Sequence, residues 1–473
     1  TFFNASSLTV ENGTLDIGST KATVGNAVFD ANSVLALTIQ DSTSYGFLTA
    51  DSISITPGAK LKVTLPNTVL GSNSSLSFHL LQSTQSFIDA FSPNIDNNLY
   101  TFTQLGDGWY EVKQSQTYRD VIEKSGGTQN NQNTATAWQT DPSPTQSGTA
   151  HAIYEELDML VQNNGDEYVQ ALTALAPSAA PLLQVLGLSY LDHFQKMTDR
   201  SNRKEYRSGQ GILWADTFGS GSHLDATTAY PELHIYGYGI GFGAEYIKND
   251  WTLGAAYLYQ FNRLKDHLRS IQTPTHGFGF YTSYTPNNFI WNTKLSFFYS
   301  RLKENKDVGG YQVTNRPSAY TTGIRSDIGY VFTPSQWMVT PKIGLQYAFI
   351  RRRTSTDSAT QKILANNLHF LTGFTKLSIE RSWKPTSDTT IIPSFEVGAS
   401  YDLSSDKDNS RVILNNALTY TLSGQKLSPW QADLSLGLTA RFGSQFECRL
   451  GAEAAFRHRY QNYIGSIKGI YYF

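Results

Sequence analysis

Residues 236–246 read YGYGIGFGAEY, an alternation in which one face of an extended chain carries Tyr, Ile, Phe and Ala and the other almost only Gly. Successive side chains of a β-strand point to opposite faces, so this stretch predicts a strand whose two faces meet different surroundings. The water-facing side of a soluble sheet has little reason to be so rich in Gly. A lumen on the Gly side and lipid on the aromatic side explain both faces, as in a transmembrane β-barrel.

The same period of two continues to the C-terminus, with Gly, polar or charged residues opposite apolar ones. It predicts twelve antiparallel strands near residues 211–219, 234–247, 251–263, 275–286, 289–301, 317–332, 337–350, 373–382, 388–402, 430–442, 446–458 and 461–473. A single-chain bacterial barrel requires an even count. Residues 411–422, which also have a strand pattern, are therefore assigned to an extended surface hairpin.

The predicted connections alternate in length. Tight turns are expected at residues 248–250, 286–288, 333–336 and 443–445, and long connections near residues 219, 301, 366 and 403. Short periplasmic turns and long outer loops are the usual asymmetry of such barrels. We therefore expect both ends of the barrel segment to lie in the periplasm.

Composition excludes several other classes of protein. Charged residues make up 16% of the 473-residue chain, against about 25% in ordinary soluble domains. The 27 Tyr, 26 Phe and 8 Trp exclude a disordered chain. No apolar run reaches the roughly 18 residues of a membrane-spanning helix. The one cysteine, Cys448, allows neither an intramolecular disulfide nor a Cys-based zinc site.

Charge divides the chain into three regions. Residues 1–115 carry a net charge of −5, residues 116–205 also −5, and residues 206–473 carry +8. We therefore predict three domains with these boundaries. The chain begins at Thr1 with no initiator Met and no basic and apolar leader, which indicates a processed or excised fragment.

The first region, residues 1–115, has short β patterns bounded by turn residues, such as Val34 to Ile39 and Leu61 to Leu65. They recur about every 20 residues, which favours the last coils of a β-solenoid; a small β-sandwich is the alternative. Residues 100–112 predict a closing hairpin.

The middle region begins with a polar stretch, residues 114–149, which we interpret as a linker. Helical spacing of apolar residues follows from Ile153 to Val161, and a second helix is expected over residues 182–206.

These features together resemble the C-terminal part of a monomeric, type Va autotransporter, and the resemblance covers nearly the whole chain. Its specific marks are the residues ALTALAP at 171–177, residues 214–219 on the first barrel strand, and the last strand. In that strand four residues share a face, similar to the family's C-terminal assembly signal: Tyr463, Ile467, Tyr471 and Phe473. Gly469 stands one residue later than the usual glycine of that signal.

The resemblance implies an all-β chain in the outer membrane of a Gram-negative bacterium. Its barrel would anchor the chain and help to export and display an N-terminal passenger, here ending in an adhesin-like β-solenoid, with the helix at 182–206 in the pore. Implied partners are the barrel-assembly machinery, periplasmic chaperones, outer-membrane lipid and, through the passenger, host or cell-surface ligands. A monomer is implied. We expect no nucleic acid, no cofactor, no metal and no catalysis by the barrel.

Some members of the family cut their pore helix at an Asn with lumen carboxylates. The candidates for such self-cleavage are Asn202, Asp216 and Glu245. In the alternative interpretation, which we prefer, these carboxylates solvate a polar lumen and pair with Arg200 and Arg203.

Three consecutive arginines, Arg351, Arg352 and Arg353, follow the seventh strand where it reaches the outer rim. Arginine binds phosphate bidentately and stays charged, so lipopolysaccharide is a candidate ligand. The alternative is three solvated loop charges.

A second function remains open: a barrel that works alone, as a porin or lipase with an N-terminal plug. A lipase would need a Ser–His pair at the rim, for which Ser222 with His234 or Ser283 with His276 are candidates. The nine His are scattered, and neither an HExxH nor a Ser-containing GxSxG motif is present.

Overall fold

The computed structural model describes most of the chain, namely residues 3–66, 69–70, 74–140, 148–178, 180–199, 209–414 and 418–473. It divides into two compact units, residues 1–136 with 152–172 and residues 137–151 with 173–473. Within the described ranges, no helix is long and apolar enough to cross a membrane.

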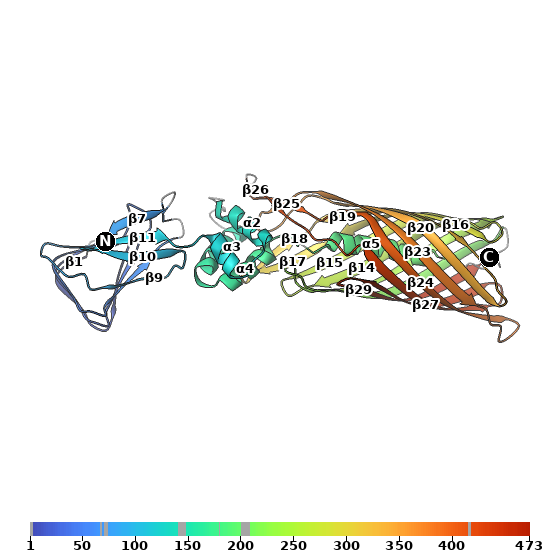
Figure 1. The fold of residues 1–473 in the computed structure, drawn as a ribbon, viewed down its shortest axis with the longest axis horizontal. Coiled ribbons are helices and arrows are strands. Elements are labelled where there is room, and N and C mark those ends of the chain that lie inside the picture. The colour runs from blue at the N-terminus through green and yellow to red at the C-terminus, as the bar shows by residue number, and fades with distance from the viewer. Residues whose placement is uncertain are drawn as a thin grey trace. The chain divides into compact units, whose positions relative to one another are not determined.

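Two parallel sheets form the N-terminal part of the first unit (Figure 1). One sheet consists of β1 (Phe3–Val10), β3 (Lys21–Phe29), β5 (Phe47–Ile55) and β8 (Leu81–Ser83). The other consists of β2 (Thr14–Gly18), β4 (Val34–Thr38), β6 (Lys60–Thr64) and β9 (Ser92–Ile95). Successive strands alternate between the two sheets, so the chain winds as a solenoid, as predicted, and the β-sandwich alternative is wrong.

The coils of the solenoid differ in length. Val10 pairs with Phe29 and Phe29 with Ile55, so one turn takes 19 residues and the next 26. The predicted repeat of about 20 residues therefore describes only the first coil. Alternate side chains such as Leu35 and Leu61 are fully buried between the sheets, so each coil covers the apolar face of the next.

The solenoid is closed by an antiparallel hairpin, as predicted. β10 (Tyr100–Gly106) pairs with β11 (Trp109–Gln114), which also pairs with β7 (Ser75–His79). Tyr110 of β11 is fully buried, and its hydroxyl donates to Asp89 Oδ2 at 2.6 Å. The hairpin thereby covers the end of the stacked coils.

Four helices precede the pore helix: α1 (Tyr118–Lys124), α2 (Gln129–Thr140), α3 (Thr149–Asn163) and α4 (Gly165–Leu175). The prediction of a linker over residues 114–149 is therefore wrong. A capping box between Thr117 and Asp120 starts α1, and the Tyr118 hydroxyl donates to Asp158 of α3 at 2.8 Å. Caps and tertiary contacts outweigh the weak apolar pattern of this polar stretch.

The second unit contains a closed antiparallel barrel of twelve strands, as predicted (Figure 1). They are β12 (Gly211–Leu224), β13 (Leu233–Lys248), β14 (Trp251–Lys265), β15 (Arg269–Tyr284), β16 (Phe289–Arg301), β19 (Ser318–Tyr330), β20 (Trp337–Arg352), β23 (Asn366–Arg381), β24 (Thr389–Ser405), β27 (Trp430–Phe442), β28 (Phe446–Arg457) and β29 (Tyr460–Tyr472). β29 pairs with β12 and closes the barrel. A closed barrel leaves no unpaired backbone edge in lipid.

The largest errors of the strand predictions lie at one end of the barrel. β12 continues to Leu224 and β23 begins at Asn366. A hairpin of β17 (Lys303–Val308) and β18 (Tyr311–Asn315) extends the sheet beyond β15. We call this the loop end, and the opposite end, with Phe473 and the tight turns, the turn end.

The predicted surface hairpin at 411–422 is confirmed. β25 (Ser410–Leu414) and β26 (Leu418–Leu422) form a small separate sheet with β21 (Ser355–Thr356) and β22 (Lys362–Ile363). Keeping these strands out of the barrel preserved the even count.

The two faces of the barrel wall differ as the alternation predicts. Tyr236, Tyr238, Ile240 and Phe242 of β13 are all about half exposed or more, although they are large and apolar. The lumen side instead buries polar residues such as Gln260, Lys294 and Glu447. Lipid therefore takes the place of a protein core outside the barrel.

Candidate functional site: the occupied pore

The pore contains α5 (Leu182–Met197), which lies inside the barrel (Figure 1). It ends well before the predicted residue 206, and residues 200–208 lie outside the described part of the chain. All but three of its sixteen residues are buried. A helix this enclosed fills the lumen.

Glycines of the barrel wall make room for the helix. Gly241, Gly279 and Gly323 lie on different strands and face Met197, Phe194 and Leu191 respectively. A Cβ atom at any of the three would overlap the facing side chain. Part of the Gly-rich face that indicated a lumen is therefore the surface on which α5 packs.

Amide side chains join the helix to the wall. His193 Nδ1 lies 2.8 Å from Gln260 Oε1, and Gln195 Nε2 donates to Gln346 Oε1 at 2.5 Å. These buried contacts fix the rotation of α5 about its axis as well as its depth.

Three basic residues of the wall surround the C-terminal end of α5. Lys468 donates to the Met197 carbonyl, Lys294 to the Gln195 carbonyl at 2.7 Å, and Arg449 to the Asp199 carbonyl at 3.2 Å. The last carbonyls of a helix lack intrahelical partners and carry partial negative charge, so cations stabilise this end.

Charged side chains of this segment are also paired. Lys294 pairs with the Asp199 carboxylate, and Lys196 pairs with Glu453 of β28. The helix segment and the barrel wall thus exchange charges in both directions, with a basic wall residue on Asp199 and an acidic wall residue on Lys196.

A second set of donors holds the chain where it leaves α4, at the loop end. Arg269 donates to the Thr173 carbonyl at 2.9 Å, and Lys306 and Gln361 donate to the Leu175 carbonyl at 3.2 and 3.0 Å. We call Arg269, Lys306 and Gln361 the latch. It provides donors to two of the last carbonyls of α4 from three separate segments of the second unit.

The carboxylates considered for self-cleavage occupy different surroundings. Asp216 lines a cavity of about 180 Å³ together with Lys196, Asp199 and Lys468, beside the end of α5. Glu245 accepts a hydrogen bond from the Tyr281 hydroxyl at 2.7 Å. Asp216 thus lies next to the residues that end α5.

The third candidate for this reaction, Asn202, lies outside the described residues, as do Arg200 and Arg203. The proposed pairing of these arginines with lumen carboxylates therefore stays a prediction.

The residues of the proposed assembly signal form one line on the outer face of β29. Their exposed fractions are 49% for Tyr463, 54% for Ile467, 47% for Tyr471 and 65% for Phe473. The Phe473 backbone N–H and carbonyl each bond to Gly211 at 2.9 Å. The last residue of the chain thus takes part in closing the barrel.

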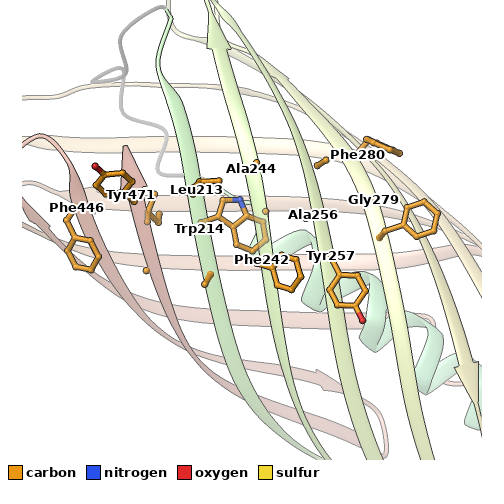
Figure 2. Close-up of a pocket in the computed structure, with 16 residues that line it drawn as sticks. Leu213, Trp214, Phe242, Ala244, Ala256, Tyr257, Gly279, Phe280, Phe446 and Tyr471 are labelled. Carbon is orange, nitrogen blue, oxygen red and sulfur yellow. The ribbon is translucent and has the colours of Figure 1, made fainter. Parts of the chain in front are cut away.

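A hollow of about 750 Å³ lies on the outer wall across the junction of β29 and β12. Small residues, including Ala215, Ala244 and Gly469, form its floor. Figure 2 shows the larger side chains around it, among them Leu213, Phe242, Tyr257, Phe280, Phe446 and Tyr471. Its apolar lining matches a lipid-facing wall.

The three consecutive arginines at the loop end point to different surroundings. Arg351 and Arg353 are exposed. Arg352 instead donates to Ser410 Oγ at 3.0 Å and lies 3.9 Å from Asp408 Oδ1. Arg351 and Arg353 are thus open to solvent, whereas Arg352 contacts the strand and loop of the surface hairpin.

The two Ser–His pairs considered for a lipase are not formed. Ser222 donates to Asn462 Oδ1 at 2.8 Å, and His234 instead contacts His223 and Glu232. His276 pairs with the Tyr257 hydroxyl at 2.7 Å.

Two features were missed from the sequence. The latch joins residues far apart in the chain, and no local pattern signals it. The cluster of His223, Glu232 and His234 has a weak signal, since residues 232–234 read ELH and His223 falls opposite His234 once the hairpin register is known.

Comparison with known proteins gives a family match over the barrel. The family model described as autotransporter beta-domain matches residues 213–453. No curated protein matches the chain.

Several solved barrels are similar. The translocator domain of autotransporter NalP from Neisseria meningitidis is 12% identical, with a TM-score of 0.49 over 61% of this chain and 97% of that one. The beta domain of the Bordetella autotransporter BrkA is 15% identical, with a TM-score of 0.42 over 56% and 98%. The Pseudomonas putida toluene transporter TodX is 8% identical, with a TM-score of 0.34 over 56% and 89%.

Proposed function

The chain belongs to the autotransporter beta-domain family, and from this premise we propose that its barrel displays residues 1–115, the end of its own passenger, on the cell surface. The barrel is an outer-membrane translocator of type V secretion. For this chain we propose in addition that residues 206–473 are the membrane anchor and that residues 116–205 connect the anchor to the displayed part.

The observation that supports display is the position of α5. The chain is held at the loop end by the latch, enters the lumen as α5, and is held again by Lys294, Arg449 and Lys468 near its C-terminal end. A helix fixed at both ends of its path serves as a tether for whatever precedes it. An open porin would instead require an empty lumen.

Orientation follows from the asymmetry of the connections. We place the turn end in the periplasm and the loop end outside, because short periplasmic turns and long outer loops are the rule for such barrels. Residues 1–115 then lie on the outer side of the tether.

For the passenger end we propose an adhesin-like role. The region is an elongated stack of parallel coils with a net charge of −5 and no Cys. Such solenoids offer long side surfaces for binding a host or cell-surface ligand. We assign no catalysis to the barrel.

Assembly is proposed to use the barrel-assembly machinery and periplasmic chaperones. The candidate recognition element is the line of Tyr463, Ile467, Tyr471 and Phe473, since it is exposed at the C-terminal strand. The translocator acts as a monomer.

Lipopolysaccharide phosphate is the proposed ligand of Arg351 and Arg353. Replacing both with Gln should reduce the lipopolysaccharide that remains bound after detergent extraction. The matched change Arg352→Gln should leave it unchanged and loosen the surface hairpin instead. Equal lipid retention in both variants would refute this assignment.

Self-cleavage is a second candidate property, supported by Asp216 beside the end of α5. We favour an uncut chain, with Asp216 and Glu245 serving to solvate the lumen. A single band that contains both residues 1–115 and the barrel is then expected on a denaturing gel. A band of barrel size alone, lost in Asn202→Ala or Asp216→Asn, would establish cleavage.

Protease treatment of intact cells tests the proposed display. We expect residues 1–115 to be removed while the barrel survives. Survival of residues 1–115 in intact cells, with loss only after the outer membrane is opened, would identify a periplasmic plug and contradict the proposal.

A further inference from the structure

The loop end of the first hairpin gathers four side chains with metal-binding or hydrogen-bonding groups. His223 of β12 and His234 of β13 are direct cross-strand partners. Glu232 directly precedes β13, and Asp225 directly follows β12. All four are exposed or partly exposed, so an ion from solvent can reach them.

The distances among three of them match a shared ion. His223 Nδ1 lies 3.4 Å from His234 Nδ1 and 3.4 Å from Glu232 Oε1. Two nitrogens bound to one tetrahedral zinc ion, each at about 2.05 Å, stand about 3.4 Å apart. One ligand atom from each of His223, Glu232 and His234 falls within 4.8 Å of the others.

The Nε2 atom of each of the two rings faces a carboxylate. His223 Nε2 lies 2.9 Å from Asp225 Oδ1, and His234 Nε2 lies 3.2 Å from Glu232 Oε1. An ionised carboxylate only accepts hydrogen bonds, so these contacts suit the tautomer with the proton on Nε2. In that tautomer the two Nδ1 atoms, 3.4 Å apart, face each other with their lone pairs free for an ion.

A cation placed between the two Nδ1 atoms would interact favourably with both lone pairs of that tautomer. A carboxylate that fixes the far nitrogen of a histidine is also the usual outer partner of a metal-bound imidazole. Asp225 therefore acts on His223 as a positioning residue.

We propose that His223 Nδ1, His234 Nδ1 and the Glu232 carboxylate bind a divalent transition metal ion, with Zn²⁺ as the best fit. Two imidazoles and one carboxylate form a ligand set that zinc uses, with a fourth position left for water. Mg²⁺ and Ca²⁺ prefer ligand sets of oxygen alone. The ion would join the two ends of the loop at 225–232 on the outside of the barrel rim.

Zinc titration of the folded chain tests the site. The full chain, refolded in detergent without a polyhistidine tag and treated with EDTA, is titrated with ZnCl₂ in a calorimeter. We expect one ion per chain that the double variant His223→Gln/His234→Gln does not take up. Asp225→Asn should weaken binding about 10- to 100-fold.

The barrel supplies a matched control. His276 and His369 also lie on the outer face, but each pairs with a tyrosine hydroxyl at 2.7 Å, and neither belongs to a three-ligand cluster among the described residues. The double variant His276→Gln/His369→Gln should bind zinc as the unaltered chain does. Heat-modifiable gel mobility confirms that each variant is folded.

Three results would overturn the proposal. The first is no zinc uptake by the unaltered chain. The second is equal uptake by the His223/His234 variant, and the third is equal loss of uptake in the His276/His369 control. Co²⁺ in place of Zn²⁺ adds an independent readout, since visible bands of a tetrahedral nitrogen–oxygen site should appear only with His223 and His234 present.

Discussion

The solenoid and the barrel use the same alternation of side chains with opposite outcomes. In the solenoid Leu35 and Leu61 point inward and are fully buried. In the barrel Tyr238 and Leu345 point outward and are 60% and 54% exposed. The solenoid buries its apolar residues against its own coils, whereas the barrel presents them to lipid.

The difference shows that a period of two identifies a strand but not the solvent on either face. What distinguishes the two regions is the opposite face of each strand. The solenoid places Thr, Ser, Asn and Lys there, which water solvates, and the barrel places Gly together with charged residues that pair within the lumen.

We expect the largest effect, a loss of barrel assembly, from deletion of the last residue. The barrel must close through its last strand, whereas the solenoid has no such requirement. Deleting Phe473 removes one outward ring, worth a few kcal/mol of apolar area at most. We nevertheless expect outer-membrane insertion to be abolished, since the exposed terminal aromatic would be lost to the assembly machinery. Wild-type amounts of heat-modifiable barrel in the deletion variant would contradict this.

The same truncation should have different costs in the two regions. Leu61→Ala leaves a cavity in the solenoid and should cost about 2–5 kcal/mol. Leu345→Ala leaves a gap that lipid fills, so about 0.5 kcal/mol is expected. Urea titrations check this, with pulse proteolysis reporting on residues 1–115 and gel mobility on the barrel. Equal costs would show that Leu345 faces protein rather than lipid.

Filling the lumen face should loosen the tether. Gly323→Leu places a side chain where Leu191 packs and should cost about 1–3 kcal/mol through overpacking. Gly465→Leu is the control, because Gly465 lies on the outer face of the barrel and a Cβ atom there meets no atom within 4 Å. We expect faster proteolysis of α5 in the first variant only. The same rate in both would indicate that α5 does not pack on this wall.

The smallest expected effect is a difference in pH dependence. Backbone and hydroxyl hydrogen bonds from Thr117 lower the pKa of Asp120, so the start of α1 loses stability as the pH falls through that lowered value. Burial raises the pKa of Asp357 beside the latch, so this loop loses stability as the pH rises from the ordinary carboxyl value through the raised one.

Hydrogen-exchange protection factors at several pH values check both slopes. Asp120→Asn should remove the pH dependence of protection at the start of α1 only, and Asp357→Asn should remove it in the loop beside the latch only. If protection changes with pH in the same direction in both regions, the opposite pKa shifts of Asp120 and Asp357 are contradicted.

Alternation predicted the twelve strands, the even count of a barrel placed residues 411–422 in a surface hairpin, and the recurrence of short β patterns predicted the solenoid. These patterns failed where structure depends on caps and distant contacts. Residues 118–124 and 129–140 are helical, although their composition is that of a linker: the Thr117 capping box starts the first helix, and the Tyr118 hydroxyl bonds to Asp158. The uneven coil lengths of the solenoid likewise come from loops that carry no repeat.

The pore site was only partly predictable. Position 216 on a lumen face follows from strand parity, and the helix near residue 182 follows from apolar spacing. The pairing of Lys468 with Met197 and of Lys306 with Leu175 could not be predicted, because each joins segments more than 100 residues apart. Closure of the barrel creates these contacts.

Labelling of single cysteines in intact cells tests the central claim, that the barrel displays residues 1–115 outside the cell. In a Cys448→Ser background, Ser86→Cys places a thiol on the exposed solenoid surface, and Ser444→Cys places one in a tight turn at the turn end. A membrane-impermeant maleimide should label Ser86→Cys at once and Ser444→Cys only after the outer membrane is permeabilised. Labelling of Ser444→Cys alone in intact cells, or of neither before permeabilisation, would contradict the account.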